Sequence, residues 1–271
     1  MRIAFIPLLA VSLLPACERG DTSEAVSRLS DMDKRMARME RKLDQIAAGR
    51  PGGAARGATG QAQGQRRGPD PAVVYSIPVD GAPLRGNPKS PVTVVEAFEF
   101  ACPACEGTRP FVKEVLAKLG DRVRVVQKTF IVHPGKADIP AYAGCAANLQ
   151  GRWEAMEALI WDEGFKARDL SRENMVKLAA RAGVDVARFE KDMDGTCVDR
   201  IKKEHQQMMS IGTGGTPTFF VNGRLLPGRS LEAIEKMVAE EEKKAAERIA
   251  QGTRPEDYYD KFIVQAGKKT L

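Results

Sequence analysis

Three features are missing from this sequence, and each absence argues against one class of protein. The apolar run at residues 3–14 is too short to cross a bilayer, which takes about 20 residues. The glycine-rich stretch at residues 212–216 lacks the Lys-Ser/Thr pair that completes a phosphate-binding loop. Only one pair of cysteines is closely spaced, whereas a zinc site usually takes a second such pair. We therefore expect no spanning helix, no phosphate loop and no zinc site.

The charge of the chain is modest and unevenly distributed. The 271 residues allow one large domain or two, and their formal net charge is +6. Much of this charge lies in residues 48–71, a stretch of Gly, Ala, Gln, Arg and Pro with almost nothing to bury. Its arginines could contact nucleic acid or anionic lipid: Arg50, Arg56, Arg66 and Arg67. We favour a solvated flexible linker and expect no nucleic-acid partner.

Residues 92–105 join a buried strand to the start of a helix. Residues 92–100 are mostly apolar and partly β-branched, as in a strand of a sheet core. Cys102 and Cys105 follow, and apolar residues then recur at helical spacing as far as Gly120. The cysteine pair therefore lies in the first turn of the predicted helix.

A helix N-terminus favours an anion, because its N–H groups have no partners within the helix. We therefore expect Cys102, the more exposed of the two, to be held partly as the thiolate that attacks disulfides. Cys105, one turn further on, would be the resolving thiol. The alternative is half of a zinc site, but the remaining cysteines are single and far apart. Pro103 and the preceding strand also fit a redox turn better than a zinc knuckle.

These residues resemble the DsbA-like branch of the thioredoxin superfamily. The resemblance rests on Cys102-Pro-Ala-Cys105 after Val-Glu-Ala-Phe-Glu-Phe, and on Thr216-Pro-Thr-Phe-Phe-Val-Asn-Gly223 downstream. It covers residues 72–267, most of the chain. It implies an α/β thioredoxin fold with an inserted helical subdomain, and thiol–disulfide exchange in the cell envelope. It implies no metal and no organic cofactor.

The same resemblance assigns roles to further residues. Thr216 and Pro217 would form the loop whose proline is cis and faces the active-site sulfurs. Glu96 falls where the family often keeps a buried acid beneath the cysteines. The sequence departs from the family at Ala104, where strongly oxidising members carry histidine. We therefore expect a less oxidising couple.

Two cysteines lie outside this motif but inside the same predicted domain. Cys145 and Cys197 are single cysteines in one helical region, and free core cysteines are common. In an exported protein, however, two such cysteines more often pair, and similar domains sometimes carry a second disulfide here. We expect a structural disulfide between them.

The N-terminus resembles a secretory signal. Arg2 precedes the apolar run, and Leu14-Pro-Ala-Cys17 resembles a bacterial lipoprotein box. Cys17 would then become the lipidated first residue, which predicts a periplasm-facing protein anchored to a membrane by lipid alone. The alternative is a signal peptide cleaved without lipidation, leaving Cys17 free.

Residues 22–47 carry a heptad repeat. Leu29, Met36 and Leu43 take position a, and Met32, Met39 and Ile46 take position d. Cations at position g, Arg28 and Arg35, can reach the anions Asp33 and Glu40 at position e of a parallel partner. An amphipathic helix on a membrane should have a wider apolar face and aromatic residues, which this segment lacks. We predict a short parallel coiled coil that makes a homo-oligomer.

Turn and capping signals divide the rest of the chain. Residues 73–79 are predicted to form an edge strand and residues 123–131 a core strand. Residues 137–211 are predicted to be helical, with Ser171 and Asp185 as caps. A hairpin with a turn at Asn222 and Gly223 and two terminal helices would follow. We therefore divide the chain into a signal peptide (1–16), a coiled-coil helix (22–47), a linker (48–71) and a DsbA-like domain (72–271).

The sequence thus predicts a cell-envelope thiol–disulfide oxidoreductase that acts on thiols or disulfides of exported proteins with an unidentified redox partner. The oligomer and Ala104 favour isomerase or reductase activity. A monomeric disulfide oxidase is one alternative. An anchored binding or assembly module with a structural disulfide is another, from a different class.

Overall fold

The computed structural model describes residues 22–48 and 68–271 and divides the chain into two units, residues 1–61 and 62–271. Each unit is considered by itself. The predicted signal peptide, Cys17 and most of the predicted linker lie outside the described residues.

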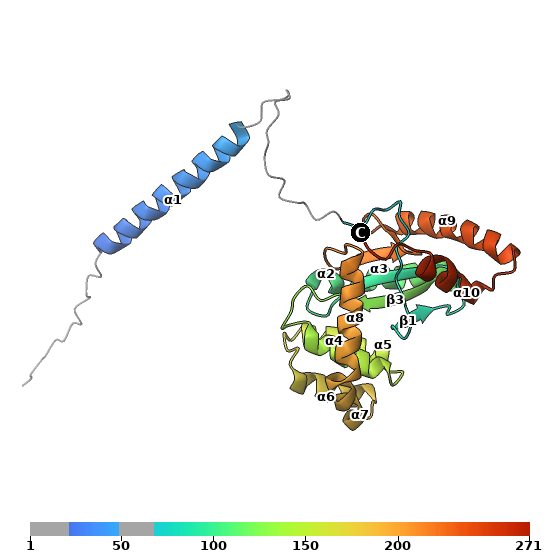
Figure 1. The fold of residues 1–271 in the computed structure, drawn as a ribbon. Helices are drawn as coiled ribbons and strands as arrows, with labels where there is room; N and C mark the ends of the chain where they lie inside the picture. The colour runs from blue at the N-terminus through green and yellow to red at the C-terminus, as the bar shows by residue number, and fades with distance from the viewer. Residues whose placement is uncertain (1–21, 49–67) are drawn as a thin grey trace, which may run out of the picture. The chain divides into compact units, whose positions relative to one another are not determined.

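The second unit is built on a mixed sheet of five strands in the order β1-β3-β2-β4-β5 (Figure 1). The strands are β1 (Leu84–Gly86), β2 (Thr93–Phe98), β3 (Arg124–Thr129), β4 (Thr218–Val221) and β5 (Arg224–Leu225). β2 and β3 pair in parallel, and the other neighbours pair antiparallel. Together with the surrounding helices, this sheet confirms the predicted α/β class.

The central strand β2 is buried along its whole length, as its apolar sequence predicts. Its alternate residues face two different apolar clusters. Val94 packs with α3 (Arg109–Leu119) and α9 (Leu231–Ala250) on one face of the sheet. Val95 and Ala97 pack with Met208 and Ile211 on the other. Helices on both faces therefore fix the register of β2 and, with it, the residues that follow.

Five α-helices and a π-helical turn lie between β3 and β4. They are α4 (Asp138–Asn148), α5 (Trp153–Leu159), the π turn Ile160–Phe165, α6 (Arg172–Ala182), α7 (Val186–Asp194) and α8 (Thr196–Ser210). The Ser171 and Asp185 side chains cap α6 and α7 by accepting hydrogen bonds from the backbone N–H groups of Asn174 and Arg188. These helices surround their own apolar cluster, which forms a separate layer of the molecule at one end of the sheet (Figure 1).

A disulfide joins the first and last of these helices. Cys145 in α4 and Cys197 in α8 are bonded, with Cα atoms 5.7 Å apart and 52 positions apart in sequence. Both residues are buried in the helical cluster. The bond therefore cross-links the first and last helices of this region within its apolar core.

The segment at residues 73–79 does not form the predicted edge strand. Tyr75 makes only an isolated bridge with Lys268. The backbone N–H of Tyr75 donates to the Gly223 carbonyl at 2.8 Å, and that of Ser76 donates to the Lys268 carbonyl at 2.9 Å. The segment thus bonds to a turn and to the C-terminal tail in place of a neighbouring strand, and Tyr75 and Ile77 are buried without forming a strand ladder.

The end of the chain follows the predicted order. Asn222 and Gly223 have φ values of 43° and 75°, as a type I′ turn requires, and join β4 to β5. The Asn222 side chain also accepts the Thr93 N–H at 2.8 Å, which ties the turn to the start of β2. Ser230 caps α9, and α10 (Pro255–Tyr259) continues into a π turn at Asp260–Gln265.

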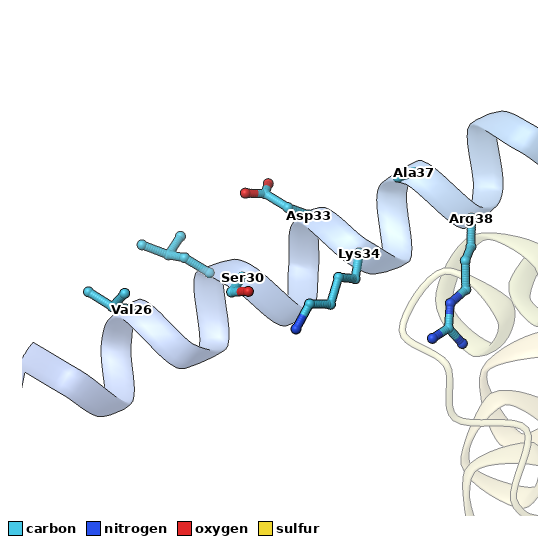
Figure 2. A pocket seen from close by; sticks show the side chains of 7 residues that line it. Val26, Ser30, Asp33, Lys34, Ala37 and Arg38 are labelled. Atoms are coloured by element: carbon cyan, nitrogen blue, oxygen red, sulfur yellow. The ribbon is translucent and has the colours of Figure 1, made fainter.

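The first unit contains one described helix, α1 (Thr22–Ala48). Five apolar side chains of α1 are between 51 % and 64 % exposed: Val26, Leu29, Met32, Met36 and Met39. A shallow hollow is lined by residues of this helix alone, and Asp33, Lys34 and Arg38 extend outward along it (Figure 2). Across residues 22–48 and 68–271, no helix is both long and apolar enough to span a membrane.

Removing the Cys145–Cys197 disulfide should destabilise the second unit. A cross-link over 52 positions removes much of the entropy of the unfolded chain, and such bonds contribute about 2–4 kcal/mol. The double variant Cys145→Ala/Cys197→Ala should therefore unfold at lower urea concentration than the wild type. A Cys102→Ala/Cys105→Ala variant serves as the matched control, since it also replaces two cysteines but removes no disulfide. Equal urea midpoints for the first variant and the wild type would contradict this expectation.

Candidate active site

The cysteine pair follows the central strand at the start of α2 (Pro103–Glu106). Cys102 is the N-cap residue, with extended backbone, and Pro103 takes the first helical position, where proline needs no hydrogen-bond partner. The backbone N–H groups of Cys105 and Glu106 both donate to the Cys102 carbonyl, at 3.0 and 3.2 Å. The local sequence therefore favours a tight turn that places Cys102 just after the end of β2.

A second segment, distant in sequence, meets Cys102. The Cys102 thiol donates to the Thr216 carbonyl at 3.4 Å, and the peptide bond between Thr216 and Pro217 is cis. Cys102 is 5 % exposed and Cys105 is 2 % exposed, while Pro103 and Ala104 lie exposed at the tip. The site is thus a nearly buried pair of free thiols beneath an exposed turn.

Burial has a large effect on the inner sulfur. Removal of water raises the pKa of the Cys105 thiol far above its ordinary value, and a hydrogen bond from the Glu99 backbone opposes this only in part. Cys105 is therefore a protonated thiol at neutral pH, which suits a residue that acts after the outer cysteine has reacted.

Glu96 lies in β2, and its side chain is buried next to α2. Its carboxyl accepts hydrogen bonds from the Thr108 hydroxyl at 2.6 Å and the Gln127 amide at 3.0 Å. The Thr108 hydroxyl is also 2.7 Å from the Cys105 carbonyl, and it has only one proton for these two acceptors. When Glu96 is protonated it can donate to Thr108, which then donates to Cys105.

Desolvation by burial raises the pKa of Glu96 from 4.5 to about 7, against the opposing hydrogen bonds from Thr108 and Gln127. Both protonation states are therefore accessible near neutral pH. The Trp153 indole N–H donates to the Gln127 amide oxygen at 3.2 Å and orients the amide toward Glu96. A hydrogen-bonded chain thus runs from the helical subdomain to the backbone of Cys105.

A second buried acid, Glu99, was not predicted from the sequence. Its carboxylate accepts the backbone N–H groups of Val132 and His133 at 2.7 and 3.1 Å, and it also contacts His133 Nδ1. Glu99 therefore fixes the loop after β3 beside the cysteine turn. An acid at the end of an otherwise apolar strand is the signal that could have identified it, but its partner 34 positions away could not be read from the sequence.

The structure brings most of the predicted site residues to one end of the sheet. Cys102, Pro103, Ala104 and Cys105 lie on the turn, Glu96 lies beneath it, and the loop with Thr216 and Pro217 faces it. Cys145 and Cys197 lie in the helical region and are bonded to each other. Within the described ranges, no three His, Cys, Asp or Glu side chains are grouped to hold a metal ion.

Comparison with protein families matches residues 79–240 to the thioredoxin family. A thioredoxin-like oxidoreductase from Silicibacter pomeroyi DSS-3 is 26 % identical, with a TM-score of 0.53 over 61 % of this chain and 94 % of that one. BdbD from Bacillus subtilis is 17 % identical, with a TM-score of 0.57 over 63 % and 98 %. DsbA from Xylella fastidiosa is 22 % identical, with a TM-score of 0.52 over 65 % and 94 %. The predicted DsbA-like thioredoxin fold is confirmed.

Matches among curated proteins are partial. The Na(+)/H(+) antiporter NhaA 1 of Mycolicibacterium gilvum is 33 % identical over 148 residues, which is 52 % of this chain and 23 % of that protein. NhaA of Herminiimonas arsenicoxydans is 32 % identical over 163 residues, 59 % of this chain and 25 % of that protein. The chain spans about a quarter of the length of the curated relatives it matches.

Stability should depend on pH through Glu96. Between pH 4.5 and about 7 the folded protein holds a proton that the unfolded chain has lost. The contribution of Glu96 to stability is therefore full below pH 4.5 and is lost as pH rises to 7, roughly 3 kcal/mol in all.

Glu96→Gln imitates the protonated acid, since its amide can donate to Thr108 and accept from Gln127. Its free energy of unfolding should lack this slope and exceed that of the wild type at pH 8. Urea unfolding from pH 4 to 8 measures both, with the exposed Glu173→Gln as the control. Parallel curves for Glu96→Gln and the wild type would disprove the assignment.

Proposed function

The chain belongs to the thioredoxin family, and from this we propose that it is a thiol–disulfide oxidoreductase that exchanges disulfides with exported proteins. The single observation that carries the proposal is the Cys102 thiol at the start of α2, against the Thr216 carbonyl and outside a buried Cys105. An outer nucleophile at the tip of the turn and an inner protonated thiol are the two parts that disulfide exchange requires.

The exchange has two steps. The Cys102 thiolate attacks one sulfur of a client disulfide, forms the Cys102–client bond and releases the other client sulfur as a thiolate. Cys105 then attacks the Cys102 sulfur, which forms the Cys102–Cys105 bond and releases the client as a dithiol. The reverse sequence oxidises a client. Continued turnover in either direction needs a redox partner that restores the starting state of the pair.

Cys105 must lose its proton before the second step, because the thiolate is the attacking form. Glu96 is one of two acids buried near the cysteine turn, and its hydrogen-bonded chain through Thr108 ends at the Cys105 carbonyl oxygen. With a pKa of about 7 it can accept a proton at neutral pH. We assign Glu96 the role of proton acceptor for the interior of the site, with Thr108 and Gln127 as its positioning residues.

Isomerase or reductase activity is the direction we favour. The side chain of Ala104 offers no hydrogen-bond donor to the Cys102 thiolate, so the reduced form gains no stabilisation from that side chain. A monomeric disulfide oxidase remains the alternative within this chemistry. A binding module with a structural disulfide is the alternative outside it, and a Cys102 thiol that never forms mixed disulfides would favour it.

We propose that α1 joins several copies of the chain. Its apolar positions a and d include Leu29, Met32, Met36 and Met39, all more than half exposed on the helix alone. A parallel coiled coil would cover this face, and it would hold several Cys102 sites near one client. An isomerase benefits from this arrangement, since the client must be held while one bond breaks and another forms.

We place the protein at the cell envelope, facing the periplasm and held by a lipid on Cys17. The lipoprotein-like sequence at residues 14–17 supports the anchor, and the Cys145–Cys197 bond suits an oxidising compartment. A lipid on each N-terminus would also favour parallel chains in the coiled coil.

Serine substitutions should separate the two cysteine roles. The wild type should reduce insulin disulfides with dithiothreitol as reductant, and Cys102→Ser should abolish this activity because no nucleophile remains. Cys105→Ser, mixed in reduced form with insulin in the absence of dithiothreitol, should instead accumulate a mixed disulfide between Cys102 and insulin, seen by mass spectrometry. Full insulin reduction by Cys102→Ser would eliminate the proposed function.

Self-association should depend on the apolar face of α1. Met32→Lys/Met36→Lys places charges at positions d and a, so we expect a monomer with weaker activity on scrambled-disulfide substrates and intact Cys102 alkylation. Ser30→Lys/Ala37→Lys adds the same charges at position b and should preserve the oligomer. Sedimentation of the delipidated protein at micromolar concentration distinguishes them. A monomeric wild type, or isomerase activity unaffected by loss of the oligomer, would refute the role of α1.

A further inference from the structure

A cavity of about 510 Å³ opens beside the cysteine turn, between the end of β2 and the helical subdomain. Its walls are apolar, formed by Ala101, Ile139, Phe165 and Leu170. Lys136 and Arg168 lie at its edge and are exposed. No acidic residue lines it. We call this feature the lateral cavity.

The lateral cavity is one residue away from the nucleophile. Ala101, which lines the cavity, is bonded directly to Cys102, so the two Cα atoms lie about 3.8 Å apart. Successive residues of an extended chain advance about 3.3 Å. A client side chain one or two residues from its reacting cysteine can therefore reach the cavity.

The apolar walls are incompletely covered. Ile139, Phe165 and Leu170 pack against the core of the helical subdomain, yet each is only half-buried. The remaining apolar surface is the part that faces the cavity. An aliphatic or aromatic side chain of a client would remove this surface from water, which is favourable in proportion to the area covered.

The charges at the edge are unopposed within the described residues. Arg172 and Arg181, on the neighbouring helix α6, pair with Asp194 and Glu163, whereas neither Lys136 nor Arg168 makes an ion pair. The nearby Asp138 and Asp169 accept the Gly135 and Ser171 N–H groups and do not line the cavity. The charged side chains that line the edge are therefore both positive.

The backbone of Arg168 is fixed at this edge by a helix C-cap. Arg168 has φ of 58°, its N–H donates to the Phe165 carbonyl at 3.0 Å, and the Asp169 N–H donates to the Gly164 carbonyl at 2.9 Å. These bonds close the turn Ile160–Phe165 with a left-handed residue, as helix ends commonly do. The guanidinium group of Arg168 therefore extends from a fixed backbone position at the edge of the cavity.

We infer that the lateral cavity is a client-binding subsite that selects an apolar side chain adjacent to an acidic residue, one or two positions from the client cysteine. This inference rests on the proposed disulfide exchange at Cys102 and names the class of client that the site prefers. The apolar side chain fills the cavity, and the carboxylate pairs with Arg168 and Lys136.

The test uses the full chain with Cys105→Ser, so that the mixed disulfide persists. Peptides carry one cysteine activated as a disulfide with thionitrobenzoate. Cys102 attacks the peptide sulfur, forms the Cys102–peptide bond and releases thionitrobenzoate as a coloured thiolate. Four peptides carry Leu or Ala two positions from the cysteine. Each of these residues is combined with either Glu or Gln as its neighbour in the peptide. The small disulfide dithiobis(nitrobenzoate) measures Cys102 reactivity without a peptide.

The Leu peptides should react about tenfold faster than the Ala peptides. The Glu peptides should react about threefold faster than the Gln peptides at low salt, and this preference should fall as salt screens the exposed charges. Arg168→Asn/Lys136→Gln should reduce the Glu-to-Gln ratio to about one, since asparagine tolerates the backbone conformation at 168. Because each ratio compares two substrates of one protein, partial misfolding of a variant does not alter it. The distant Lys177→Gln, whose partner is Glu173, is the matched control and should keep the wild-type rates.

The outcomes separate two failures. If Cys102 reacts with the small disulfide but all four peptides react alike, the subsite is absent and the proposed function stands. If the Glu preference survives in Arg168→Asn/Lys136→Gln, the acidic part of the specificity is wrong. If Cys102 reacts with no disulfide at all, the proposed function fails, and the client subsite fails with it.

Discussion

Water is excluded from the space between β2 and α2, and two ionisable groups lie within it. A carboxylate or a thiolate there loses its hydration, so the uncharged forms of Glu96 and Cys105 are favoured. Cys102 lies at the boundary of the same space, at the start of α2, where its thiol donates to the Thr216 carbonyl. The same buried strand end thus keeps the inner thiol protonated and holds the outer one against the loop with the cis proline.

This exclusion of water requires that other polar groups find partners within the protein. Thr108 and Gln127 supply them for Glu96, while Glu99 takes up three donors from the loop after β3. These bonds join β2 and the residues just after it to the start of α3, to β3 and to the loop after β3. The polar contacts therefore position the turn, and the apolar core around it supplies most of the burial.

Local patterns in the sequence predicted the parts of the fold that depend on neighbouring residues. The apolar run of β2, the caps at Ser171 and Asp185, and the turn at Asn222 depend on properties of a few adjacent side chains. Residues 73–79 have the composition of a strand, but their partners are a turn and a tail from the other end of the chain. The Glu99 contacts and the lateral cavity likewise join segments distant in sequence, which no local pattern reveals.

The order of the strands along the chain has a consequence for how the molecule assembles. Val94 of β2 pairs with Val221 of β4, which is separated from it by all five helices of the subdomain. Contacts among those helices join segments closer in sequence, and such contacts form faster than distant ones. The helical subdomain can therefore fold while the sheet still lacks β4. During synthesis Cys102 leaves the ribosome more than a hundred residues before Thr216. A nascent chain thus carries its reactive thiols before it carries the loop that completes their site.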